Sequence, residues 1–271
     1  MMLTILRPLS TSELLDRTFH LYKNDFLIFF TIVAIPQLAL LGVKLLYAES
    51  VHGMTRGRIG LLAIPVSLLT VVCLGISQAA TVHAVSNLQL GRPARVGEAF
   101  AAIRPSIFRY LWIAFALTYI IAFGFLLLLI PGVYWTLKYA VAMPSAVVEG
   151  TGLSESMSRS SELTEQDLQR VLALYALFTL LTWTVGGLLQ FGLGLRFPFL
   201  RVHGPVIFHA TRYVLLTVAA FVTQSLVGPL LTIALTLLYY DERVRKEGFD
   251  LQLMMSNLEG AAPAAAAVAA P

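Results

Sequence analysis

The chain has 271 residues, of which 58% are hydrophobic and only 13% are charged, against about 45–50% and about 25% in ordinary soluble domains. This composition excludes a soluble globular enzyme, because the surplus apolar surface has to face lipid. The net charge is +4 and the basic residues lie in short segments between apolar stretches, which favours lipid head groups over nucleic acid as the partner.

Long stretches without Asp, Glu, Lys or Arg predict the membrane helices, since a helix that crosses a bilayer needs about 20 apolar residues. Five such stretches occur, and the third continues past Lys138 to Val148. Pro131-Gly132 is typical of a tight turn, which divides this longer stretch into pieces of about one span each. The sequence therefore predicts six membrane helices, at residues 26–47, 61–87, 108–130, 132–148, 171–195 and 213–240.

A short segment with a glutamate precedes the first, third and fifth of these helices. The three segments are Ser12-Glu13-Leu14-Leu15, Gly97-Glu98-Ala99-Phe100 and Ser154-Glu155-Ser156-Met157. Each opens a stretch with apolar residues at helical spacing, and in the first copy Ser10 and Glu13 have capping-box spacing. Glu13 and Arg17, like Glu155 and Arg159, are four residues apart and favour ion pairs. These stretches are too short to span and too charged for burial in lipid, which predicts amphipathic helices at the membrane interface.

These elements predict an all-α, polytopic integral membrane protein with six transmembrane helices in three hairpins. Each hairpin with its short helix forms one unit, at residues 10–96, 97–153 and 154–240, followed by a C-terminal cytoplasmic segment. The alternative to a true repeat is a chance match of short helix starts. Residues 1–255 are expected to form a single domain, and the Ala- and Pro-rich residues 256–271 a flexible tail.

The distribution of Lys and Arg predicts the orientation. Twelve of the 19 fall on the side of the two termini and six on the other, while Lys138 lies inside a helix. Cytoplasmic loops near helix ends carry the excess of basic residues. Both termini are therefore expected on the cytoplasmic side.

Polar residues within the apolar stretches are the first candidate set for a site, because their burial in lipid is costly. They are Lys138, Gln37, Gln78, His83, Gln190 and Gln224. The glutamines either form hydrogen bonds between helices or line a solute pathway. Lys138 either extends to the outer interface, pairs inside the bundle or contacts a substrate.

Signals of catalysis, metal binding and nucleotide binding are absent from the sequence. Cys73 is the single cysteine, and the five histidines are scattered without metal-ligand spacing; only His203 and His209 lie near one another. No glycine-rich nucleotide loop occurs. We therefore expect no catalytic, cofactor-binding or metal-binding residues and no cofactor.

Several short motifs, read together, resemble a known family. They are the C-terminal string from Leu237 to Leu251 (LLYYDERVRKEGFDL), the opening Arg7-Pro8-Leu9-Ser10, the turn Ile130-Pro131-Gly132-Val133, and Glu149-Gly150 followed by Ser158-Arg159-Ser160. Residues 5–255 are similar to the uncharacterised bacterial membrane proteins that are grouped with the glycerophosphoryl diester phosphodiesterase membrane domain.

This resemblance implies an all-helical, multi-pass protein of the bacterial cytoplasmic (inner) membrane. Some members carry a fused phosphodiesterase domain, but too few residues follow Tyr240 for such a domain, so we expect no enzyme activity. Family members are expected to have arginine at the position of Lys138, which puts any role of a bidentate guanidinium in doubt.

The preferred function is that of a non-enzymatic structural or accessory membrane protein, with membrane lipids, other proteins or a second copy of the chain as partners. Candidate residues for such an interface on the cytoplasmic side are Glu13, Arg17, Glu98, Glu149, Glu155 and Arg159. A small solute transporter or channel is the alternative. An intramembrane lipid-processing enzyme comes third, because the sequence places no carboxylate within the predicted spans.

Overall fold

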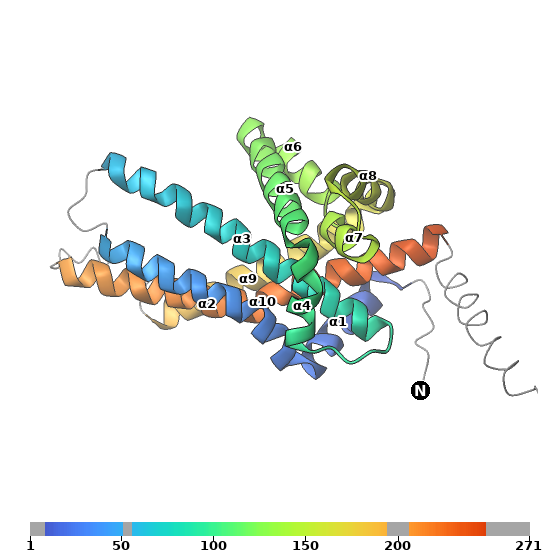
Figure 1. Ribbon diagram of the computed structural model, residues 1–271, viewed down its shortest axis with the longest axis horizontal. Coiled ribbons are helices and arrows are strands. Elements are labelled where there is room, and N and C mark those ends of the chain that lie inside the picture. Colours follow the sequence, from blue (N-terminus) through green and yellow to red (C-terminus); the bar gives the residue numbers. More distant parts are fainter. Residues whose placement is uncertain (1–8, 51–55, 194–205, 248–271) are drawn as a thin grey trace, which may run out of the picture.

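The computed structural model describes residues 9–50, 56–193 and 206–247, and every regular element in these ranges is a helix (Figure 1). In chain order they are α1 (Thr11–Asn24), α2 (Phe26–Ser50), α3 (Arg56–Gln89), α4 (Val96–Ile103), the 3-10 helix η1 (Arg104–Ser106), α5 (Ile107–Leu127), α6 (Leu129–Lys138), α7 (Ala142–Glu149), α8 (Leu153–Thr164), α9 (Leu168–Gly192) and α10 (Val206–Glu247). The predicted all-α class is confirmed. The predicted tail 256–271, the opening Arg7-Pro8, His203 and the end of the C-terminal string lie outside the described residues.

Five helical segments in these ranges are long and apolar enough to cross a membrane. They are Phe26–Tyr47, Ala63–Gln89, Val96–Leu127, Leu168–Gly192 and Thr211–Glu247. Large apolar side chains stand exposed on them, among them Leu27 (74%), Trp112 (65%) and Trp183 (69%). Because so large an apolar surface is unfavourable in water, these side chains face lipid. The chain is a multi-pass helical membrane protein.

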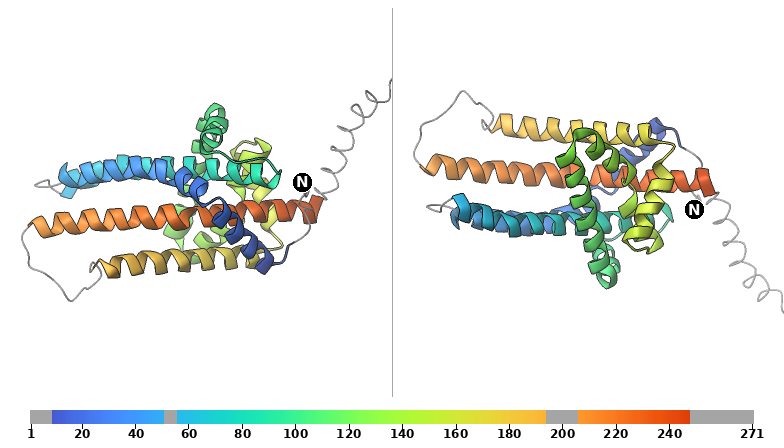
Figure 2. Two further views of the ribbon diagram at one scale, coloured as in Figure 1. Left: turned by 90° about the horizontal axis from the view of Figure 1, so that it is seen from below. Right: turned by 90° about the horizontal axis from the view of Figure 1, so that it is seen from above.

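Helices α2, α3, α9 and α10 run alongside one another as an elongated bundle (Figures 1 and 2). Helix α10 packs against α2, α3 and α9, and Phe29, Phe178 and Ile233 are buried in the core. With 42 residues, α10 is about 63 Å long at about 1.5 Å per residue, roughly twice the hydrocarbon thickness of a bilayer. Part of α10 therefore extends beyond the hydrocarbon layer.

Helices α5 and α6 form a hairpin that leans away from this bundle, and the chain turns at Leu128, not at Pro131-Gly132 as predicted (Figure 1). Leu128 has an extended backbone, with φ −165° and ψ 157°. Pro131 is the third residue of α6, where its missing N–H breaks no helical hydrogen bond. Gly132 permits close contact with α5, since a Cβ there would lie 2.5 Å from Cγ of Phe125.

The predicted membrane helix 132–148 is wrong as a single element, because two short helices, α6 and α7, replace it. Pro144 is the third residue of α7. In a continuous helix Pro144 would remove the hydrogen bond to the carbonyl of Ala140, so the helix stops and restarts before it. Helix α7 then ends at Gly150, whose φ of 70° suits glycine. The residues that the structure describes thus contain five membrane-length helices.

The three predicted short helices are confirmed as helices α1, α4 and α8. The capping box of α1 is present: the Glu13 N–H donates to Oγ of Ser10 at 3.2 Å, and the Ser10 N–H donates to Oε2 of Glu13 at 2.8 Å. Half of this arrangement recurs in α8, where the Gly152 N–H donates to Oε2 of Glu155 at 3.3 Å, because glycine has no side chain that could accept in return. Pro105 lies in η1, which separates α4 from α5.

Helix α1 packs tightly against the long helices. Leu14 and Thr18 are fully buried, and the Tyr22 hydroxyl donates to the carbonyl of Leu226 in α10 at 2.6 Å. Burial raises the pKa of Tyr22 to about 12. Helix α1 is thus a built-in part of the fold, and its location at the membrane interface stays a prediction.

Candidate functional site

A buried charged cluster joins the first described residue to the last helix. We call it the Arg170 cluster; it consists of Leu9, Arg170, Asp241, Glu242 and Arg245. The Leu9 N–H donates to Oδ1 of Asp241 at 2.6 Å, and Arg170 donates to Oδ2 of Asp241 at 2.5 Å and to the Leu9 carbonyl at 2.8 Å. The side chain of Asp241 is 0% exposed and that of Arg170 is 8% exposed. Both ends of the described chain therefore lie at the same end of the bundle, which we call the terminal end.

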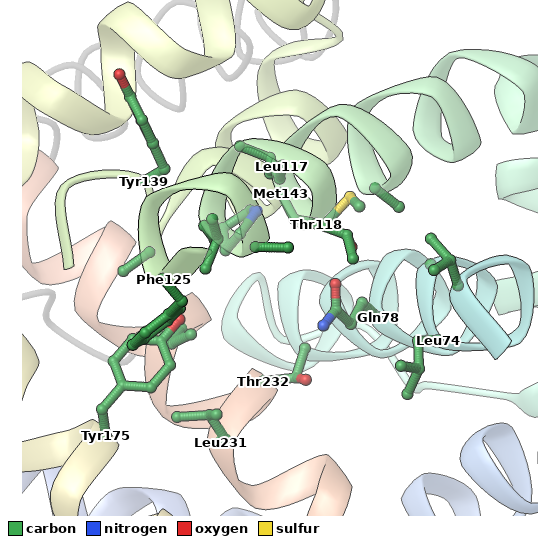
Figure 3. Close-up of a pocket in the computed structure, with 18 residues that line it drawn as sticks. Leu74, Gln78, Leu117, Thr118, Phe125, Tyr139, Met143, Tyr175, Leu231 and Thr232 are labelled. Carbon is green, nitrogen blue, oxygen red and sulfur yellow. The ribbon is translucent and has the colours of Figure 1, made fainter. Parts of the chain in front are cut away.

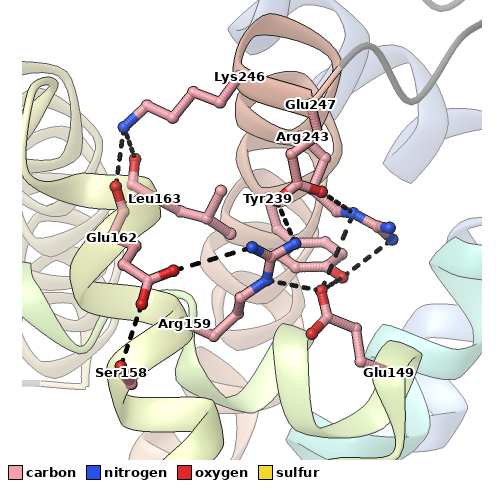
Figure 4. A network of polar contacts seen from close by, with 9 residues as sticks. All are labelled: Glu149, Ser158, Arg159, Glu162, Leu163, Tyr239, Arg243, Lys246 and Glu247. Carbon is pink, nitrogen blue, oxygen red and sulfur yellow. Dashed lines mark hydrogen bonds and ion pairs between the residues drawn. The ribbon is translucent and has the colours of Figure 1, made fainter.

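A second network links α7, α8 and α10 near the terminal end (Figure 4). We call it the Glu149 network; it consists of Glu149, Arg159, Tyr239, Arg243 and Glu247. Nε of Arg159 and the Tyr239 hydroxyl both donate to Oε1 of Glu149, at 3.0 and 2.7 Å. Arg159 also pairs with Glu247, to which Arg243 donates at 3.1 Å. Burial lowers the pKa of Arg159, but the hydrogen bonds that Arg159 donates to Glu149 and Glu247 outweigh this effect and raise the pKa.

These two groups of charges hold helices together. Each guanidinium contacts carboxylates or carbonyls of another segment of the chain, such as Arg170 with Asp241 and Arg159 with Glu149. Among the residues that the structure describes, no three His, Cys, Asp or Glu side chains come together to hold a metal ion. We therefore assign the Arg170 cluster and the Glu149 network a structural role.

A cavity of about 480 Å³ lies between α3, α5, α7, α9 and α10 (Figure 3). We call it the α3–α5 cavity. Most of its lining is apolar, with Leu74, Leu117 and Leu231 among the lining residues. In Figure 3 the Gln78 amide points into the space that Thr232 also lines.

This cavity opens on the side where α5 leans away from α3. Four of its lining residues, Gln78, Thr118, Ala122 and Phe125, are exposed. All four belong to segments that are long and apolar enough to cross a membrane. The opening therefore faces the lipid layer.

Two smaller cavities adjoin the α3–α5 cavity. The middle cavity, of about 190 Å³, is lined by Gln78 and Gln224, and the outer cavity, of about 200 Å³, by Lys44, Gln37 and Gln224. Leu74 lines all three cavities. The three cavities thus follow one another from the Lys44 side of the bundle toward the terminal end.

Some of the polar side chains that line these cavities form hydrogen bonds with the protein and others do not. Hydroxyls such as those of Thr70, Ser77 and Thr217 donate to a carbonyl one turn earlier in their own helix, at about 2.8 Å in each case. The amides of Gln37, Gln78 and Gln224, the residues predicted to be polar at membrane depth, form no hydrogen bond with another described residue. Unsatisfied amides are costly in an apolar layer. Hydrogen bonds between helices therefore do not explain these three glutamines within the described ranges.

The other predicted embedded residues do not line these three cavities. His83 lies 3.4 Å from the Asn87 amide, measured from Nδ1 to Nδ2, and Gln190 is half-buried in α9. Lys138 ends α6 beside α8, where its carbonyl accepts hydrogen bonds from Ser160 at 2.9 Å and from Thr164 at 3.1 Å.

The position of Lys138 does not fit an extension toward the outer interface. Nζ of Lys138 lies 5.7 Å from the ring centre of Tyr134, a cation–π contact. Helix α8, which packs against the end of α6, also accepts hydrogen bonds from Lys246 at the end of α10. Lys138 therefore lies toward the terminal end.

The predicted cytoplasmic interface residues fall into separate places. Glu13 and Glu155 cap α1 and α8, and Glu98 forms an exposed ion pair with Arg95 at 3.2 Å. Arg17 donates to Oε1 of Gln89 at 2.8 Å. The structure does not gather these residues into one interface.

Only Glu149 and Arg159 of that set come together, in the Glu149 network. Arg159 pairs with Glu149 and Glu247 in place of the predicted partner Glu155. The C-terminal string supplies Tyr239, Arg243 and Glu247 to this network. Residue spacing within a single helix does not reveal these contacts between helices.

Sequence reasoning missed the Arg170 cluster. Asp241 and Glu242 follow the last apolar stretch in a strongly charged segment of the sequence, but both are almost completely buried. The available signal was the dense run of charged residues at Asp241–Lys246 directly after an apolar stretch. Their partners, Leu9 and Arg170, lie at least 71 residues away along the chain.

Comparison of the chain with family models, with curated proteins and with solved structures finds no match. The resemblance to the glycerophosphoryl diester phosphodiesterase membrane domain therefore stays a prediction from the motifs.

Proposed function

We propose that this chain is a non-enzymatic accessory membrane protein that acts by binding a membrane lipid in the α3–α5 cavity. The observation that carries this proposal is an apolar cavity that opens toward the lipid layer and adjoins three glutamine amides without partners. A lipid fits both kinds of lining. Its acyl chains make apolar contacts with Leu74 and Leu117, and its ester or headgroup oxygens accept hydrogen bonds from the amides.

The proposal is tested by filling the cavity. Leu74→Trp places a larger side chain where all three cavities meet, so we expect the purified protein to retain several-fold less lipid. Lipid bound after purification in mild detergent is measured by native mass spectrometry. Leu126→Trp, at a position that is 81% exposed on the hairpin tip, is the matched control and should retain lipid normally.

Equal lipid in both variants and the wild type would contradict lipid binding in the cavity. If Leu74→Trp fails to fold, Ala122→Phe at the exposed mouth of the α3–α5 cavity replaces it, with the same expected loss of lipid.

A small transporter or channel is the second candidate, because the three cavities follow one another through the bundle from Lys44 to Tyr139. Flux of a solute into vesicles that contain the purified protein, and its loss in Leu74→Trp, favours this alternative.

We also infer that α6 and α7 together return the chain to the side of the membrane where α5 begins. Arg109 near the start of α5 donates to the carbonyl of Gly150, just after α7, at 2.6 Å. The contact between Leu9 and Asp241 at the same end of the bundle supports an even number of passages. The three-unit division at 10–96, 97–153 and 154–240 remains a proposal of the same kind.

We place both termini on the cytoplasmic side of a bacterial inner membrane, on the basis of twelve basic residues on that side against six on the other. A reporter that is active only in the periplasm, fused at Gly260, is expected to be inactive. Strong activity of that fusion would reverse the orientation.

A further inference from the structure

The outer cavity lies near one end of the membrane-spanning part of α2. Lys44 is three residues before the end of the segment Phe26–Tyr47, about 4.5 Å at about 1.5 Å per residue. The Tyr213 hydroxyl donates to the Lys44 carbonyl at 3.5 Å and so places α10 beside α2 at this level. Gln37 and Gln224 lie deeper, each seven residues from the level of Lys44 and Thr217.

The nitrogen donors that line this cavity have no acceptor among the described residues. Lys44 is half-buried and forms no ion pair with a described carboxylate, and the amides of Gln37 and Gln224 form no hydrogen bond there. The hydroxyls of Thr70 and Thr217 already donate to their own helices. One ammonium and two amides thus surround a space of about 200 Å³, an arrangement that favours a negatively charged group with further oxygens.

We propose that the outer cavity binds the headgroup of an anionic membrane lipid, whose acyl chain continues into the middle and α3–α5 cavities. The phosphate oxygens accept from Nζ of Lys44, and the ester carbonyls accept from the amides of Gln37 and Gln224. This inference rests on the proposed function, because it names the lipid that the cavities bind.

The length of the path through the three cavities agrees with this placement of the acyl chain. From Thr217 to Leu235, which line the outer and the α3–α5 cavity, α10 advances 18 residues, about 27 Å at about 1.5 Å per residue. The hydrocarbon core of a bilayer is about 30 Å thick and is filled by two opposed layers of chains. The path therefore has room for one acyl chain, and Leu74 and Leu231 supply apolar contacts along it.

The test compares phosphatidylglycerol, which is anionic, with phosphatidylcholine, which is zwitterionic. The full chain is reconstituted into an equal mixture of the two lipids and extracted in mild detergent, and the retained lipid is identified by native mass spectrometry. We expect the wild type to retain mainly phosphatidylglycerol. Lys44→Met should lower this preference about tenfold, as expected for the loss of a charge-assisted hydrogen bond, and Lys44→Arg should keep it.

Lys138→Met is the matched control, since Lys138 is a second lysine in an apolar stretch but lines none of the three cavities; its preference should equal that of the wild type. An unchanged preference in Lys44→Met overturns the headgroup site. If Lys44→Met does not fold, Gln37→Leu takes its place and is expected to reduce retention of phosphatidylglycerol.

Three further outcomes separate the possible failures. If an excess of inorganic phosphate displaces the bound phosphatidylglycerol, the cavity is a site for a free anion and the inference is wrong. If both lipids are retained equally by the wild type but are lost in Leu74→Trp, the headgroup site fails while lipid binding in the cavity stands. If no variant changes lipid retention, the proposed function itself fails.

Discussion

Arg170→Met is expected to lower the free energy of unfolding by about 3–5 kcal/mol, the usual effect of removing one partner from a buried ion pair. The substitution leaves the fully buried Asp241 and Glu242 without their shared cation and removes the hydrogen bond to the Leu9 carbonyl. Oε2 of Glu242 already lacks a described partner, and the described donor to Oε1 of Glu242 is Arg170 itself, so the substitution leaves this carboxyl group without a described donor. The measurement is the thermal unfolding midpoint in detergent, together with the yield of monodisperse protein.

Arg95→Met is the control for this experiment. Arg95 pairs with Glu98 across one turn, but its side chain is 73% exposed, and such pairs contribute less than about 1 kcal/mol. A loss of stability in Arg170→Met no greater than that in Arg95→Met would show that the Arg170 cluster does not hold the terminal end together.

The second large effect is expected for Gly132→Ala in the α5–α6 hairpin. The new Cβ would lie 2.5 Å from Cγ and 2.8 Å from the backbone nitrogen of Phe125. A side chain can rotate away, but the backbone cannot, so α6 has to move off α5. Overpacking of this kind costs about 1–3 kcal/mol, and we expect a lower unfolding midpoint and faster proteolysis near the hairpin.

Gly42→Ala in α2 tests whether the cause is the contact or the glycine itself. No atom lies within 4 Å of a Cβ at Gly42, and alanine favours a helix by up to about 1 kcal/mol over glycine. This variant should be neutral or slightly more stable. If Gly132→Ala behaves in the same way, α5 and α6 are not packed backbone to backbone.

Much of the helix pattern follows from the sequence because its causes are local. Uninterrupted apolar stretches predict α2, α3, α9 and α10, and the pair Ser10 and Glu13 predicts the start of α1 from two residues three positions apart. Proline was interpreted less well. Pro131 and Pro144 were expected to mark a turn and to lie inside a helix, whereas each occupies the first turn of a short helix and the break precedes it. Sequence alone does not distinguish these roles, because proline fits both positions.

For the candidate site, too, the local features were predictable and the long-range ones were not. Gln37, Gln78 and Gln224 were identified because a polar residue in an apolar stretch is visible without any tertiary information. Their arrangement around shared cavities was not, since it depends on how α2, α3 and α10 face one another. The Arg170 cluster could not be predicted either, because Leu9 and Asp241 are 232 residues apart along the chain.

That separation bears on how the protein is made. Leu9 is synthesised before every described helix, and Asp241, to which its N–H donates, is added 232 residues later. Until α10 has been inserted, Arg170 lacks Asp241 and Glu242, and the N–H of Leu9 lacks its acceptor. Assembly of the terminal end is therefore postponed until the last helix enters the membrane. A chain that stops short of Asp241 therefore leaves the guanidinium of Arg170 without either of its carboxylate partners.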